Sequence, residues 1–255
     1  FTVGLSRDNT FSNPIYPKGG SRFSITAKFT LPYSAFDGRD YEGLAAEREI
    51  ALENNDQDEI ARIDQIRFDW LEFYKVNFNA EWFNKLIGDL VLRTNVEFGF
   101  LGAYNQDRGV PPFERFFVGG DGLAGVTLDG REIIRLRGYP NQSIIPRTRS
   151  NVSEETFNDG ATIYNKFTFE LRYPITLNPS ASIYGLTFFE AGAAFDNFES
   201  FSPFELNRSA GLGLRIFMPA FGLLGIDFGY GFDPIPGTNL GPNGWETHFI
   251  IGQQF

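Results

Sequence analysis

The stretch Lys166–Tyr173, which reads KFTFELRY, decides the class of fold. Its apolar side chains, Phe167, Phe169, Leu171 and Tyr173, alternate with polar or charged ones. A period of two indicates a β-strand, because successive side chains of a strand point to opposite faces of the sheet. The stretch therefore predicts a strand that separates an apolar environment from a polar one.

The same alternation recurs along the chain, in nine segments that we expect to be strands. They span residues 1–7, 21–31, 70–82, 89–104, 164–175, 182–195, 208–218, 223–233 and 246–255. Short and long connections alternate between them. Short turns at one end and long loops at the other are typical of the antiparallel barrels of bacterial outer membranes.

Two architectures contain strands of this kind. A soluble β-sandwich buries the apolar faces between two sheets, whereas a membrane barrel turns them toward lipid and keeps the polar faces in a wet lumen. Strands of about ten residues can cross a bilayer when tilted, and full charges at mid-strand, such as Glu97 and Arg215, suit a wet lumen. We therefore expect an all-β fold, a transmembrane antiparallel barrel. The residues expected on its lipid side include Phe23, Leu92, Phe169 and Phe228.

Nine strands do not complete a barrel of the usual kind. Single-chain bacterial barrels have an even number of strands, and an open sheet edge in lipid leaves backbone groups without partners. The chain also begins with Phe1 rather than Met. We therefore expect upstream strands, so that residues 1–255 are the C-terminal part of a larger barrel domain.

Composition argues against several classes of function. The 255 residues include no Cys and one His, which disfavours disulfide scaffolds, thiolate metal sites and multi-His metal sites. No Gly-x-Ser-x-Gly motif accompanies His248, which we expect to be a polar residue facing the lumen. The formal net charge of −10 disfavours nucleic acid as a partner. We expect no enzymatic activity, no catalytic residues, no cofactor, no metal site and no nucleic-acid partner.

One long connection is unusual in its charge. Residues 37–69 contain 11 acidic and 4 basic residues, a net charge of −7. Helix-forming residues occupy most of this segment, and Ile60, Ile63 and Ile66 recur at helical spacing. We expect an acidic helical insert in an extracellular loop. A solvated hairpin is the simpler interpretation, and a docking surface for a partner or for divalent cations near lipopolysaccharide is the alternative.

A second long loop, residues 105–163, carries the motif Leu136-Arg137-Gly138-Tyr139. This motif resembles the loop motif of the BamA family, a hydrophobic residue followed by Arg, Gly and then Phe or Tyr. Other segments resemble the family in the same order along the chain. They are residues 16–22 (YPKGGSR), 169–174 (FELRYP), 188–192 (FFEAG), 209–213 (SAGLG) and 251–255 (IGQQF). The resemblance covers nearly the whole chain.

The resemblance implies a function, because BamA barrels insert other barrels into the outer membrane. The chain would be the last nine strands of sixteen, without the first seven strands and the periplasmic POTRA domains. It would lie in the outer membrane of a Gram-negative bacterium, of Bacteroidota type, with its C-terminus in the periplasm. Its partners would be unfolded outer-membrane proteins as substrates, the accessory lipoproteins of the BAM complex, outer-membrane lipid and lipopolysaccharide.

The resemblance also implies which residues matter in the long loop. In the family this loop folds back into the barrel, and its Arg pairs with carboxylates on the inner wall. Carried over, Arg137 would pair with Glu170 and Glu190, Gly138 would allow a tight turn and Tyr139 would pack beside the wall. The inward orientation of Glu190 is harder to predict than that of Glu170, because Glu190 falls on the same face of its expected strand as the apolar residues Leu186 and Phe188.

The last strand forms the second implied site, a lateral seam. Phe249 and Ile251 would face lipid, Gly252 interrupts the apolar row, and Phe255 ends the chain with an aromatic residue, as terminal assembly signals of outer-membrane proteins do. In the family this strand pairs weakly with the first strand. The seam can then open, and an incoming strand adds by β-augmentation.

Two other functions remain open at this point. Relatives with the same barrel include the autotransporter-assembly protein TamA and the transporters of two-partner secretion. A passive porin or receptor barrel is an alternative from a different class.

Overall fold

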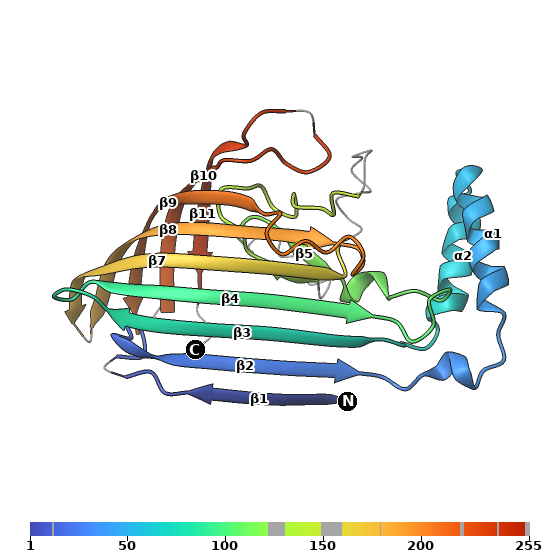
Figure 1. Cartoon of the computed structure of the whole chain (residues 1–255), viewed down its shortest axis with the longest axis horizontal. Coiled ribbons are helices and arrows are strands. Elements are labelled where there is room, and N and C mark those ends of the chain that lie inside the picture. The colour runs from blue at the N-terminus through green and yellow to red at the C-terminus, as the bar shows by residue number, and fades with distance from the viewer. Residues whose placement is uncertain are drawn as a thin grey trace.

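The computed structural model describes residues 1–11, 13–121, 131–148, 160–178, 180–219, 222–238 and 240–252. Nine strands form one antiparallel sheet in the order β1-β2-β3-β4-β7-β8-β9-β10-β11 (Figure 1). The bounds are Thr2–Asp8 (β1), Gly19–Phe29 (β2), Tyr74–Lys85 (β3), Val91–Gly102 (β4), Ile163–Asn178 (β7), Ala181–Phe195 (β8), Asn207–Met218 (β9), Gly222–Gly231 (β10) and Gly244–Ile251 (β11). Strands that follow one another in the sheet are thus joined by hairpin connections, the topology of an outer-membrane barrel wall.

The sheet is strongly curved, and the connection between β4 and β7 lies on its concave side (Figure 1). Part of this connection forms a second, two-stranded parallel sheet from β5 (Phe116–Val118) and β6 (Glu132–Ile134). Short turns gather at one end of the large sheet and long connections at the other. Within the described residues, β1 pairs with β2 alone and β11 with β10 alone.

The apolar faces of the strands other than β8 point away from the concave side, as the alternation predicts. Phe169 is 45% exposed and Phe228 is 48% exposed. The polar neighbours Glu170 and Asp227 are buried on the concave side. Phe23 lies on the outer face, where its ring packs against Phe78 at 5.5 Å between centroids. A sandwich, which would bury these side chains between two sheets, is the wrong architecture.

Strand bounds differ from the sequence-based expectation by up to four residues, and two differences are informative. The third strand begins at Tyr74 rather than at residue 70, and the alternation itself breaks at this point, because polar Glu72 falls on the face of the apolar residues Tyr74 and Val76. The Glu72 carboxylate accepts hydrogen bonds from Ser34 and Arg108, so this residue belongs to the connections around the helical hairpin rather than to the strand. The short strands β5 and β6 were not predicted, because segments of three residues are too short to show a period.

The acidic segment forms a helical hairpin. Its helices are α1 (Tyr41–Glu53) and α2 (Gln57–Phe68), and the carboxylates of Asp40 and Asp56 accept the N-terminal N–H groups of Gly43 and Glu59. Between the helices lie the buried side chains of Ala51, Ile60 and Ile63. Two short 3-10 helices, η1 (Tyr33–Ala35) and η2 (Pro112–Glu114), flank the hairpin and β5. Neither α1 nor α2 is long and apolar enough to span a bilayer.

Candidate functional site

The concave face of the sheet holds the motif of the long loop against the wall. Gly120 and Leu136 exchange backbone hydrogen bonds at 3.2 Å, which extends the pairing of β5 and β6 up to the motif. Leu136 is fully buried in a cluster with Phe116, Val118 and Ile134. This small apolar core gives the loop a fixed shape, so that the next residue, Arg137, enters the wall in a defined direction.

Arg137 lies among three carboxylates from three strands. Its Nη2 atom is 2.7 Å from Glu170 Oε1 and 2.6 Å from Glu190 Oε1. Its Nη1 atom is 3.3 Å from Asp227 Oδ2. The guanidinium also stacks on Phe188, with its Cζ 3.7 Å from the ring centroid. All these groups are nearly inaccessible to water, so each charge depends on the others for compensation.

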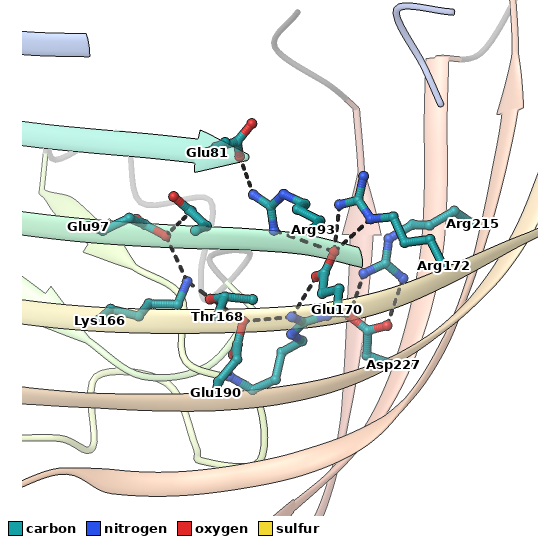
Figure 2. A network of polar contacts seen from close by, with 12 residues as sticks. Glu81, Arg93, Glu97, Lys166, Thr168, Glu170, Arg172, Glu190, Arg215 and Asp227 are labelled. Carbon is teal, nitrogen blue, oxygen red and sulfur yellow. Dashed lines mark hydrogen bonds and ion pairs between the residues drawn. The ribbon is translucent and has the colours of Figure 1, made fainter. Parts of the chain in front are cut away.

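The carboxylates around Arg137 are shared with cations of the wall itself (Figure 2). Glu170 accepts hydrogen bonds from Arg172 at 2.5 and 2.8 Å and lies 3.4 Å from Arg93. Asp227 receives a bidentate pair from Arg215 at 2.6 and 2.7 Å. Figure 2 shows these side chains converging from β4, β7, β9 and β10. The loop therefore completes a network that joins neighbouring strands.

Gly138 is the residue of the motif that approaches the wall most closely. Its φ of +82° lies in the left-handed region, and a Cβ atom there would sit 2.8 Å from Ser209 Cβ. Its backbone N–H donates to His248 Nε2 at 2.8 Å, and its carbonyl accepts from Asn243 Nδ2 at 2.9 Å. Only glycine fits this position without displacing β9 or β10.

Tyr139 fixes the far end of the motif. Its hydroxyl donates to the Arg208 carbonyl at 2.8 Å and accepts from the Asp233 N–H at 3.2 Å. The side chain is fully buried, and burial raises the pKa of Tyr139 to about 12. The hydroxyl thus stays protonated and remains a donor at physiological pH.

Glu190 points inward although its parity is shared by apolar residues. Leu186 and Phe188 also point to the concave side, where they pack with Tyr16, Phe83, Val91 and Tyr184. We name this group the floor cluster, since it lies near the short turns. The Tyr16 hydroxyl ties it to the wall, since its single proton is shared between the carbonyls of Arg172, at 2.7 Å, and Asp89, at 2.9 Å. The apolar residues that share a face with Glu190 in β8 therefore form an inner core on the concave side and do not face lipid.

The predicted seam residues lie on the last strand. Phe249 is 52% exposed and Ile251 is 69% exposed. Gly252 has a φ of +80°, and its N–H donates to Leu223 of β10 at 2.9 Å. Phe255 lies outside the described residues.

Three residues whose side chains hydrogen-bond to the motif, Asp227, His248 and Asn243, were not among the predicted site residues. Asp227 and His248 carry a signal in the sequence, since both are polar residues on the inward parity of their strands. Asn243 carries none, because it belongs to a connection. In the described part of the chain no group of three or more potential metal ligands occurs. The chemistry available is that of a charge-compensated clamp between a loop and a wall.

Comparisons with known proteins agree with this fold. The model of the Omp85 superfamily domain matches residues 1–255. The chain is 26% identical over 147 residues to the outer membrane protein assembly factor BamA of Neisseria meningitidis serogroup B, a match that covers 57% of this chain and 16% of that protein. In structure it is similar to BamA from Haemophilus ducreyi lacking POTRA domains 1-3, with a TM-score of 0.59 and 17% identity over 98% of this chain and 42% of that one.

These matches define what the chain shares with its relatives. It spans less than half the length of either BamA protein, and the likeness to the solved structure is one of fold. The sequence-based expectation of a BamA-type barrel portion is confirmed at this level, whereas the placement in Bacteroidota and the count of sixteen strands stay predictions. Because the family model covers every residue, the chain belongs to the Omp85 superfamily.

Proposed function

We propose that this chain is the seam-bearing part of an outer-membrane insertase, which folds β-barrel proteins and inserts them into the bacterial outer membrane. The observation that carries the proposal is the clamp of Arg137 between Glu170, Glu190 and Asp227. It joins a folded-in loop to the strands that lead to the last strand of the sheet. In this proposal the C-terminus of β11 lies in the periplasm and the long connections lie outside the cell.

The clamp gives the wall a stiffness that an open sheet lacks. Removing one partner from a buried ion pair costs about 3–5 kcal/mol, because the remaining charge loses its compensation. Held in this way, β9 and β10 stay in register while β11 presents a backbone edge. A strand that pairs with that edge gains backbone hydrogen bonds, which is how β-augmentation produces affinity.

The proposed role involves no covalent chemistry, so the protein acts by positioning strands and needs no cofactor. Its substrates are unfolded outer-membrane proteins, and its surroundings are outer-membrane lipid and lipopolysaccharide. Accessory lipoproteins of a BAM complex are the proposed partners. The match to two BamA proteins supports this choice over the other barrels of the superfamily.

The test is depletion of the full-length protein followed by quantitation of all outer-membrane proteins. An insertase predicts general loss of barrels and recovery with the wild-type gene but not with the Arg137→Glu variant. Loss confined to autotransporters or to one secreted substrate supports the TamA-like or two-partner secretion alternatives. Unchanged barrels with altered solute uptake support a porin or receptor.

A further inference from the structure

The connection between β8 and β9, residues 196–206, lies against the outer face of the sheet. β9 pairs with β8 only up to Gly192, whereas β7 pairs with β8 up to Phe195. The last residues of β8 therefore extend beyond β9, and the connection turns back beside them (Figure 1). We name residues 196–206 the outer flap.

The outer face loses its exposure where the outer flap lies. Phe169 of β7 and Phe189 of β8 are 45% and 40% exposed. Ile163 of β7 and Phe195 of β8 are on the same face, because side chains of a strand alternate, but they are 0% and 3% exposed. These two residues and Ala193 pack with Phe98, Phe100, Phe201 and Leu206. The outer flap thus covers part of the face that is open to lipid further along the same strands.

Aromatic rings hold the outer flap on the wall. Phe201 packs edge-on against Phe98 and Phe195, at 5.8 and 5.1 Å between ring centroids. Phe198 packs against Phe100 of β4 at 4.5 Å. The Phe201 N–H donates to the Phe198 carbonyl at 3.3 Å, so a turn places both rings toward the wall. Such pairs contribute about 0.5–1.5 kcal/mol each beyond the area that they bury.

A polar residue of the outer face depends on this cover. Asn165 of β7 points to the same side as Ile163 and Phe167, yet it is 3% exposed. Its Nδ2 atom donates to the Pro203 carbonyl of the outer flap at 2.9 Å, and its Oδ1 atom has no partner among the described residues. An amide without a hydrogen bond is costly in an apolar medium. The outer flap therefore compensates for a polar side chain on a face that otherwise meets lipid.

The outer flap also presents apolar surface of its own. Phe204 is 88% exposed and Phe198 is 58% exposed. Phe204 follows Pro203, whose carbonyl contacts Asn165 within the paired part of β7, so Phe204 lies beside the wall rather than beyond its end. The two rings continue the apolar outer face, and aromatic girdles mark the membrane interfaces of outer-membrane barrels.

We infer that the outer flap is a membrane-inserted surface and that its partner is the acyl chains of the surrounding lipid. Phe201 holds it to the wall, and Phe204 enters the hydrocarbon at the end of the barrel where the long connections lie. The exposed carboxylates Glu199 and Glu205 set its depth, since charged groups stay with the headgroups. The inference goes beyond the proposed insertase role, because it requires only that the outer face of the sheet meets lipid.

The first experiment measures where Phe204 lies in the full-length protein, reconstituted in vesicles of phosphatidylethanolamine and phosphatidylglycerol. The 255 residues contain no Cys, and any cysteine in the remainder of the protein is first replaced by Ser. A nitroxide on Phe204→Cys should be relaxed by oxygen, which concentrates in hydrocarbon, and protected from a water-soluble nickel chelate. Phe169→Cys is the control for lipid. Ile50→Cys, at a 59% exposed apolar residue of α1, is the control for water.

A label at position 204 that is as accessible to the nickel chelate as the label at position 50 would overturn the inference. The exposed rings would then belong to a free connection or to a surface for a soluble partner. A label at position 169 that reads as water would overturn it as well, because the outer face itself would then not meet lipid. Neither reading depends on insertion of other barrels.

The second experiment tests the cover over Asn165 by the sign of a change in stability. Asn165→Leu removes the donor to the Pro203 carbonyl and should lower the urea midpoint for unfolding from the same vesicles. The matched control is Thr187→Leu, at an exposed polar residue on the outer face of β8 away from the outer flap, which should raise the midpoint or leave it unchanged. A rise for Asn165→Leu would show that Asn165 faces lipid and would overturn the inference. If Asn165→Leu does not refold, the label at position 204 decides.

Discussion

Arg137 and Glu190 are joined twice. The Arg137 backbone N–H donates to Glu190 Oε2 at 2.9 Å, and its Nη2 atom donates to Glu190 Oε1 at 2.6 Å. Glu170 also contacts Arg137 but is shared with the two guanidinium groups of Arg93 and Arg172, whereas the other cation near Glu190 in the described chain is Lys166, at 3.8 Å. Glu190 is thus the more specific partner, since it fixes both the main chain and the side chain of the motif.

This difference predicts an asymmetric rescue. Arg137→Glu should strongly impair barrel assembly, because it places a fourth carboxylate among three buried ones and costs at least about 3–5 kcal/mol. A second change, Glu190→Arg, should restore part of the folded fraction. Glu170→Arg should not, since it would set a cation between Arg93 and Arg172. Heat-modifiable mobility on gels measures the folded fraction.

The control for this series is Arg62→Glu on α2. Arg62 pairs with Glu59 on an exposed surface, where such pairs contribute about 0–1 kcal/mol. It should assemble like wild type. Equal rescue of Arg137→Glu by Glu170→Arg and Glu190→Arg would contradict the asymmetry.

Gly138→Ala should destabilise the barrel far more than Gly88→Ala. Both glycines have positive φ angles, +82° and +59°, so both substitutions carry the backbone strain of a left-handed residue. Only at Gly138 does the new Cβ meet the wall, 2.8 Å from Ser209 Cβ, while nothing lies within 4 Å at Gly88. Urea unfolding in detergent should show a loss of about 1 kcal/mol for Gly88→Ala and at least twice that for Gly138→Ala.

A buried ion pair lies at the base of the acidic hairpin, and its loss should loosen the hairpin without unfolding the barrel. We call this pair and the residues bonded to it the root. Arg108, at 1% exposure, donates to Glu72 at 3.2 Å and to the Tyr41 hydroxyl at 3.1 Å. Arg108→Met leaves the Glu72 carboxylate buried without its cation, so the connection should loosen and α1–α2 should be cleaved faster by protease. The wall network shares no residue with this root, and the fraction of folded barrel should stay near that of wild type. Arg62→Met is the matched control.

The orientation of the sheet is tested by a charge on its outer face. Phe169→Arg places a cation on the exposed apolar side of β7 and should destabilise the folded barrel by about 2–4 kcal/mol near the bilayer midplane. Phe36→Arg changes an 83% exposed aromatic residue in the connection before α1 and should have little effect. Refolding into lipid vesicles across a urea series measures both variants. A tolerated Phe169→Arg would argue that this face meets water.

The strand pattern was predictable from the sequence because it is local. Alternation at Phe169 and Glu170 fixes which side of β7 is wet, and the structure shows the same division. The expected start of β3 at residue 70 was too early, because the alternation breaks at Glu72, a buried residue that pairs with Arg108, 36 positions away. A partner so distant in the sequence cannot be identified from the local alternation of polar and apolar residues.

Some wall contacts of the Arg137 motif could be predicted from the sequence and others could not. Glu170 and Glu190 follow from the resemblance to a known loop motif. Asp227 lies 90 positions from Arg137, and His248 lies 110 positions from Gly138. Their inward parity indicates polar lumen residues, but the choice of partner depends on how the loop enters the sheet. The apolar core that sets this entry includes β5 and β6, which the sequence does not reveal.

The floor cluster has a consequence for how the loop is coupled to the wall. Tyr16, Phe83 and Phe188 cover the concave face near the short turns with apolar surface. Phe188 lies against the Arg137 guanidinium of the loop, and Phe83 and Tyr184 lie 5.7 Å from the Arg172 guanidinium of β7. Because one aromatic group holds cations of both the loop and the wall, loss of ring surface there should loosen the two together.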